Sequence, residues 1–167
     1  MEVLTLSSAL SVDQFSSGRA RNFKVQPTVE EIAELVSRFD FVSIKDLRAK
    51  VTIRKVAHDC WDVAGNLSAQ VVQRCVITDD PVPELVDFII EERYVRKAEG
   101  FDVVEVDLNG AEPLVGGEID IGEMVAQTLG IAVTPWPKSH VSAENLIEEA
   151  ILDEHPFAGL AALKKPE

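Results

Sequence analysis

The sequence predicts a single α+β domain in which an antiparallel sheet packs against helices. Three observations predict it: a capped amphipathic pattern over residues 28–39, alternating apolar and polar residues from about 46 to 95, and a second capped helical pattern over 121–130. Short turns divide the alternating region into three strands, which is typical of an antiparallel meander. The pattern leaves open whether this sheet curls toward a partial barrel.

The first helix is predicted from its start signal and from its apolar spacing. Thr28 and Glu31 have the spacing of a capping box, in which each side chain bonds the backbone N–H of the other residue. Apolar side chains then recur at helical intervals, at Ile32, Leu35, Val36 and Phe39. We therefore expect an amphipathic helix with one buried stripe.

The first strand of the meander is predicted from strict alternation over residues 47–54. The two faces are Leu47, Ala49, Val51 and Ile53 on one side, and Arg48, Lys50, Thr52 and Arg54 on the other. The apolar face is predicted to be buried. The other face is predicted to be solvent-exposed and basic.

The second strand is predicted over residues 61–77, where apolar residues again share one parity. Gly65 interrupts the pattern and predicts a β-bulge. Cys75 has the inward parity, so we expect a buried thiol that behaves as a small apolar group, while Arg74 points to the opposite face. A catalytic role for Cys75 is therefore not expected.

The second strand ends in a turn, and a third strand follows it. Asp79 and Asp80 stand before Pro81, and carboxylates next to a residue without an N–H are typical of a turn. Apolar residues of one parity then predict the third strand, at Val86, Phe88, Ile90 and Tyr94. Residues 96–113 form an acidic, weakly patterned insertion.

The last third of the chain contains a second helix and a proline-flanked connection. Asp120 and Glu123 have capping spacing ahead of an apolar stripe, which predicts the helix over 121–130. Trp136 lies between two prolines and is expected to be packed. Ser142 is expected to cap a further, acidic helix.

Composition bounds the function classes. The 167 residues are 46% hydrophobic, which suits one domain with a real core, and no run approaches the roughly 20 apolar residues needed to cross a bilayer. The start of the chain lacks the pattern of a secretory signal, so we expect a cytoplasmic protein with reduced thiols and no membrane partner.

The net charge of −13 is unevenly distributed. Residues 19–74 hold ten Lys or Arg against seven Asp or Glu, whereas residues 79–123 hold three against fourteen. This asymmetry indicates two different surfaces, one able to meet phosphate and one able to meet a basic protein. The alternative is that the acidic surface only keeps the protein soluble.

The sequence offers no recognisable catalytic or cofactor site. Gly116, Gly117 and Gly122 lack the spacing of phosphate-binding loops, and no carboxylate pair or Ser-His-Asp context suggests an enzyme. Neither a CxxC nor an HxxxH motif frames a zinc site, so we expect no metal and no cofactor.

Three segments carry a resemblance to a known family. They are "WDVAGNLSAQVVQRCVITDDPVP", "EPLVGGEIDIGEMVAQTLGIAVTPWP" and the closing "HPFAGLAALK". In this order they resemble the YceD family, the large-ribosomal-RNA-subunit accumulation proteins of bacteria and plastids, and the closing segment is similar to the alphaproteobacterial branch. The resemblance covers residues 26–165 as one domain and leaves 1–25 as a partly flexible N-terminal segment.

The family-motif positions are Gly65, Gln73, Cys75, Pro81, Asp120 and Gly122, and we expect structural roles for them. The chain departs from the family in two turns: Thr78 to Pro81 stands where a Thr-Leu-Glu-Pro turn is frequent, and "TPWP" replaces an Asp-Pro-Tyr-Pro run. It also lacks the clustered C-terminal cysteines of some relatives. The resemblance implies a non-enzymatic ribosome-biogenesis factor that supports accumulation of large-subunit ribosomal RNA.

The candidate contacts for ribosomal RNA, or for the pre-ribosomal large subunit, are Arg48, Lys50, Arg54 and Arg74. If the second strand pairs with the first as a hairpin, Ser68, Gln70 and Arg74 lie beside the basic face and complete a surface suited to a phosphate backbone. An ordinary solvated face is the alternative reading. A further alternative is an acidic adaptor that binds a basic ribosomal protein without touching RNA.

Overall fold

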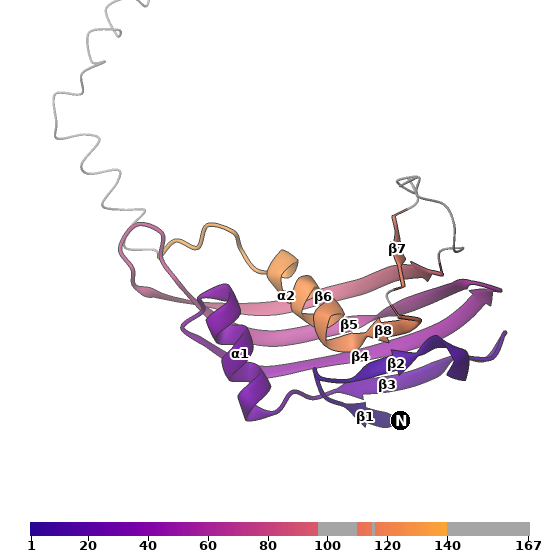
Figure 1. Ribbon diagram of the computed structural model, residues 1–167. Helices are drawn as coiled ribbons and strands as arrows, with labels where there is room; N and C mark the ends of the chain where they lie inside the picture. The colour runs from indigo at the N-terminus through magenta and orange to yellow at the C-terminus, as the bar shows by residue number, and fades with distance from the viewer. Residues whose placement is uncertain (97–109, 115, 140–167) are drawn as a thin grey trace, which may run out of the picture.

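The computed structural model describes residues 1–96, 110–114 and 116–139, and its fold class is α+β (Figure 1). The elements, in chain order, are β1 (Glu2–Leu4), β2 (Ala9–Ser11), η1 (Val12–Gln14), β3 (Arg21–Val25), α1 (Val29–Phe39), β4 (Ser43–Ala57), β5 (Cys60–Arg74), β6 (Pro81–Val95), β7 (Ala111–Pro113), β8 (Glu118–Asp120) and α2 (Ile121–Ala132). Six strands form one sheet in the order β1-β3-β4-β5-β6-β7, and β2 pairs with β8 in a separate ribbon.

The predicted three-strand meander is confirmed. β4, β5 and β6 have fifteen residues each and pair antiparallel along most of their lengths. Two residues, His58 and Asp59, connect β4 to β5, and residues 75–80 connect β5 to β6. Such short connections force consecutive strands to run in opposite directions.

The prediction of a purely antiparallel sheet is wrong at both edges. β1 pairs parallel with β3, and β7 pairs parallel with β6. Parallel pairing needs a connection that returns the chain to its starting end, and residues 5–20 provide it between β1 and β3. The sheet is open, with β1 and β7 at its two edges, so it does not close into a barrel.

The first 25 residues contribute three strands and part of the core. β3 pairs with β4, and β1 pairs with β3. Several of their apolar side chains are buried, namely Leu4, Leu10, Val12, Phe15, Phe23 and Val25. This segment therefore extends the sheet beyond the meander that the sequence predicts.

The two faces of the sheet differ as the alternation predicts. The inward residues Leu47, Ala49, Val51 and Ile53 are buried, whereas Arg48, Lys50 and Arg54 are exposed. Figure 1 shows α1, α2 and the β2–β8 ribbon on one side of the sheet. We call this side the covered face, and the side with the exposed β3–β6 side chains the open face.

Gly65 does not form the predicted bulge, because it pairs in register with Val51 on β4 and Ile90 on β6. The β4–β5 register shifts instead at two places in β4, between Lys45 and Arg48, where Asp46 has a positive φ of 52°, and between Lys55 and Ala57. Gly65 has a different role. A β-carbon at this position would overlap the carbonyl oxygen of Lys50, so only glycine permits this close approach of β5 to β4.

Both predicted helices are confirmed, and each begins at its predicted cap. Thr28 and Glu31 form the capping box of α1. Asp120 accepts a hydrogen bond from the Glu123 backbone N–H at 2.9 Å and caps α2. The helix expected to begin at Ser142, and most of the acidic insertion, lie outside the described residues.

Candidate nucleic-acid interface

Three cations gather on the open face, where β3 and β4 run side by side. Lys50 of β4 lies directly opposite Lys24 of β3, and Arg48 follows on the same face of β4. We call Lys24, Arg48 and Lys50 the basic column. Within the described part of the chain, none of the three forms an ion pair. Like charges directly opposite each other destabilise a sheet, so a counter-charge from a partner would relieve this site.

Hydrogen-bonding side chains surround the basic column. Asn66 lies opposite Lys50, and Ser68 lies opposite Arg48. Thr52 donates a hydrogen bond to the Asn22 side-chain oxygen at 2.7 Å. A shallow hollow of about 490 Å³ opens among residues that include Asn22, Lys50, Thr52 and Asn66. Cationic and amide groups beside a hollow can bind phosphate and sugar oxygens.

Arg54 lies on the same face but next to a carboxylate. It is opposite Asp62, and Asp62 accepts two hydrogen bonds from Arg93, at 2.7 and 3.1 Å. These bonds, and then the charges of Arg93 and Arg54, lower the pKa of Asp62 against its partial desolvation. Arg54 is therefore partly neutralised, which makes it a weaker candidate than Arg48 or Lys50.

Arg74 lies far from the basic column. It is at the end of β5, opposite Pro81, and its guanidinium is 3.5 Å from the Asp79 carboxylate. Six residues of extended strand separate it from Ser68, the partner of Arg48, which is a distance of roughly 20 Å. The fold brings together Arg48 and Lys50 of the four predicted contacts, and it leaves Arg74 at a separate end of the sheet.

Lys24 is the member of the basic column that the sequence analysis missed. The signal was present in "RNFKV", where Phe23 and Val25 alternate with Asn22 and Lys24 as in a strand. Five residues are a short pattern, however. Which residue lies opposite Lys24 depends on the β3–β4 register, and a pattern within one strand does not contain that information.

Gln73 and Cys75, near the end of the β5–β6 hairpin, make contacts that hold the fold together. The Gln73 side chain donates to Glu84 at 3.1 Å and to the Thr134 carbonyl at 3.0 Å, and Glu84 accepts from the Thr134 hydroxyl at 2.8 Å. Cys75 is buried, as predicted, and its sulfur accepts from the Ser139 N–H at 3.4 Å. Together these bonds fasten the connection after α2 to the β5–β6 hairpin.

Trp136 is not packed as predicted, because it is 72% exposed. Its neighbour Pro137 is buried and accepts a hydrogen bond from the Val76 N–H at 3.0 Å, which holds the connection against the β5–β6 turn. The two prolines and this bond fix the backbone there while the indole ring lies in solvent. Flanking prolines therefore do not predict the burial of the residue between them.

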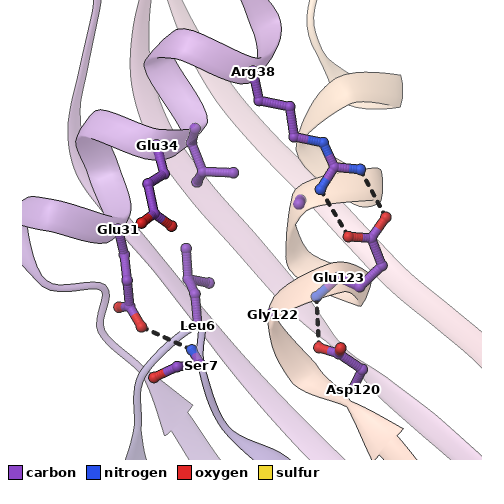
Figure 2. Close-up of a pocket in the computed structure, with 10 residues that line it drawn as sticks. Leu6, Ser7, Glu31, Glu34, Arg38, Asp120, Gly122 and Glu123 are labelled. Carbon is purple, nitrogen blue, oxygen red and sulfur yellow. Dashed lines mark hydrogen bonds and ion pairs between the residues drawn. The ribbon is translucent and has the colours of Figure 1, made fainter.

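A hollow of about 250 Å³ lies between α1, α2 and the turn after β1 (Figure 2). Its carboxylates give it the appearance of an acid–base site, but most of them hold the fold together. Figure 2 shows Glu31 bonded to the Ser7 N–H, Asp120 at the α2 cap, and Glu123 facing Arg38. Glu123 and Arg38 form two hydrogen bonds of 2.7 Å each. The arrangement joins α1 to α2, and we assign it no catalysis.

We expect the Arg38–Glu123 pair to stabilise the protein at neutral pH and to lose this effect in acid. Hydrogen bonds from Arg38 and then Gln127 lower the pKa of Glu123 from 4.5 to about 2. A lowered folded-state pKa gives stability that is present above pH 4.5 and is lost as the pH falls toward 2. Glu123→Gln should lower the free energy of unfolding at pH 7 by about 0.5–1 kcal/mol, because the pair is partly exposed.

Chemical denaturation between pH 2 and 7 measures this effect. The difference between wild type and Glu123→Gln should shrink as the pH falls from 4.5 toward 2. Glu34→Gln is the control, since Glu34 lines the same hollow without an ion pair among the described residues. A difference that stays constant with pH would contradict this assignment.

The β6 part of the open face has a different character. Asp87 and Glu91 are exposed there, together with the apolar Leu85 and Ile89. The charge asymmetry of the sequence is thus partly a division across one sheet face, with cations on β3 and β4 and carboxylates on β6. Between them, β5 carries neutral residues such as Asn66 and Ser68.

No helix among the described residues is long and apolar enough to cross a membrane. In the same part of the chain no group of three or more His, Cys, Asp or Glu residues is arranged to hold a metal ion. Compared with known proteins, the chain matches no family model, and no curated protein or solved structure matches it. The resemblance to YceD proteins therefore rests on the three quoted segments.

Proposed function

We propose that this protein is a non-enzymatic, cytoplasmic ribosome-biogenesis factor that supports accumulation of large-subunit ribosomal RNA. Its basic column contacts the RNA backbone. The observation that carries the proposal is the set Lys24, Arg48 and Lys50 on an open sheet face, where none of the three forms an ion pair with another described residue. Contact through phosphate and sugar oxygens reads RNA shape rather than sequence.

The charge distribution supports a specific role for the basic column. A chain with a net charge of −13 needs no basic surface for solubility. Nevertheless, Lys24 and Lys50 lie directly opposite each other on the neighbouring strands β3 and β4, an arrangement that lowers the stability of the fold. Asn66 and Ser68 add neutral hydrogen-bonding groups that suit ribose hydroxyls.

A second candidate function is that of an acidic adaptor for a basic ribosomal protein. Asp87 and Glu91 on β6, next to two exposed apolar side chains, support it. The candidates differ in what remains bound after RNA is removed. In a pull-down from native lysate at low salt, nuclease releases a protein held by RNA, whereas a directly bound protein partner stays.

The RNA contact is tested by the salt dependence of binding to a large-subunit ribosomal RNA transcript. The double variant Arg48→Ser/Lys50→Ser should bind more weakly, and its slope of log affinity against log salt should fall by about 2, because each lost phosphate contact removes about 1. The fold should be unchanged, since both side chains are exposed.

The control is Arg19→Ser/Lys138→Ser, which removes two exposed cations outside the basic column. Both double variants change the net charge equally, so a loss due only to overall charge would appear in each. The proposal expects the loss in Arg48→Ser/Lys50→Ser alone. If wild type and both variants bind RNA with equal affinity and equal salt slope, the basic column does not contact RNA.

A further inference from the structure

Among the described residues, the outer edge of β6 is unpaired over most of its length. β7 pairs with β6 only at residues 93–95, and in the part of the chain that the structure describes no strand borders residues 81–92 on that side. β5 occupies the other side of β6 along all fifteen residues without a register shift. Long free edges that carry apolar side chains are templates for pairing with another chain.

The hydrogen bonds of the neighbouring strands show which backbone groups of β6 point outward. The Val72 carbonyl accepts a hydrogen bond from the Val42 N–H at 2.8 Å on the β4 side. Because backbone groups alternate along a strand, the N–H and C=O of even-numbered β5 residues point to β4, and those of odd-numbered β5 residues point to β6. Odd β5 residues pair with even β6 residues, such as Leu67 with Phe88. The odd residues of β6 therefore direct N–H and C=O away from β5.

Three residues near the two ends of β6 agree with this direction. The Val95 carbonyl accepts from the Leu114 N–H at 2.9 Å, on the β7 side. Pro81 and Pro83 have the same parity, and proline is tolerated in a strand where its missing N–H faces a free edge. The outward backbone groups between these ends belong to Leu85, Asp87, Ile89 and Glu91.

The side chains of these four residues alternate between apolar and acidic on the open face. Leu85 is 82% exposed and Ile89 is 69% exposed, and Asp87 and Glu91 are exposed between and beside them. Side chains of an added strand would lie about 4.5–5.5 Å away. Apolar residues next to Leu85 and Ile89, and basic residues next to the two carboxylates, complement this edge.

A second copy of this chain fits the edge poorly. Antiparallel pairing of two β6 edges centred on Ile89 would place Asp87 opposite Glu91, and pairing centred on Asp87 would place two Asp87 carboxylates together. Pairing centred on Phe88 would place Asp87 opposite Ile89 and Glu91 opposite Leu85, and residues 81–92 contain no Lys or Arg that could pair with a carboxylate in any register. Like charges directly opposite each other are destabilising. Charge complementarity therefore favours a basic segment of another protein.

We propose that the free edge of β6 takes up an extended segment of a partner protein, with alternating basic and apolar side chains, as an added strand. The proposal rests on the adaptor candidate above and names its mode of binding. Backbone hydrogen bonds at residues 85–91 hold the segment, while Asp87, Glu91, Leu85 and Ile89 select its side chains. The basic column on β3 and β4 stays accessible to RNA, because β5 lies between β4 and β6.

The sharpest test separates backbone pairing from charge attraction. Ile89→Pro removes an outward N–H without breaking the β5–β6 ladder, whereas Ile89→Thr loses the same apolar side chain and keeps the N–H.

The probe is a fluorescent peptide of about nine residues, in which lysine and valine alternate on one face and threonine fills the other. Asp87→Asn/Glu91→Gln tests the charges, with Glu30→Gln/Glu34→Gln on α1 as its matched control.

We expect the peptide to bind the full-length wild type, and Ile89→Pro to weaken binding at least tenfold relative to Ile89→Thr. Asp87→Asn/Glu91→Gln should also weaken binding, whereas the α1 control should not. Amide hydrogen exchange gives a direct readout: the N–H groups of residues 85, 87, 89 and 91 exchange fast in the free protein and slow when the peptide is bound. Circular dichroism of Ile89→Pro must match wild type.

Four outcomes would overturn the proposal. They are absence of peptide binding, equal affinity of Ile89→Pro and Ile89→Thr, concentration-dependent dimers that Ile89→Pro abolishes, and slow exchange of the four amides in the free monomer. The third outcome would assign the edge to a second copy, and the fourth to another part of this chain. RNA affinity of Ile89→Pro is measured in parallel, so that failure of the strand proposal is distinguishable from failure of the RNA contact.

Discussion

Gly65→Ala should lower the free energy of unfolding by about 3 kcal/mol, at the upper end of what overpacking costs. An added β-carbon would overlap the Lys50 carbonyl oxygen and would lie 2.9 Å from the Val51 Cα. Both obstacles are backbone atoms, so no side-chain rotation relieves them, and β4 and β5 must separate locally. The midpoint temperature should fall by roughly 10 °C.

Thermal and urea unfolding of Gly65→Ala measure this effect, with Ala64→Ser as the control. Ala64 is the preceding residue and is exposed on the open face, so its substitution should change stability by less than about 0.5 kcal/mol. Weaker RNA binding by a Gly65→Ala protein of unchanged stability would contradict the structural role, because it would place Gly65 in the contact with RNA instead.

Gly122→Ala should have a similarly large effect, about 3 kcal/mol, at the other end of the core. Gly122 is in the first turn of α2, where an added β-carbon would overlap the Leu6 carbonyl oxygen and lie 3.2 Å from the Leu6 Cα. The α2 N-terminus must then move away from the turn after β1. That movement also pulls Glu123 away from Arg38, so the pH-dependent stability of this pair should be lost as well.

Ile131→Ala is the control for Gly122→Ala. Ile131 lies in the same helix but is 74% exposed, so its truncation leaves no buried cavity and should change stability by less than about 0.5 kcal/mol. Equal stabilities of Gly122→Ala and wild type would mean that the first turn of α2 does not depend on close contact with Leu6.

Gly65 and Gly122 are two of the positions that resemble the YceD family, and the structure gives both a packing reason. Gln73 and Cys75 fasten the connection after α2, Asp120 caps that helix, and Pro81 begins β6 with its missing N–H on the free edge. These residues therefore hold parts of this fold together. The candidate binding surfaces lie elsewhere, on the basic column and on the free edge of β6.

The sequence by itself determined the local elements. The capping box at Thr28, the cap at Asp120 and the alternation from Leu47 onward depend on contacts a few residues apart, so α1, α2 and the three long strands are predictable from their own segments. The inward parity of Cys75 and the outward parity of Arg48 and Lys50 follow for the same reason.

The tertiary structure decided which residues meet across the sheet. The Lys24–Lys50 pair depends on strand register, the separation of Arg74 from Arg48 depends on strand length, and the Arg38–Glu123 bonds join residues 85 positions apart. The parallel edge strands and the free edge of β6 depend on where long connections return the chain. Register and strand neighbours are set by packing of the whole core. The residue pattern within one segment does not show which strand pairs with it, or in which register.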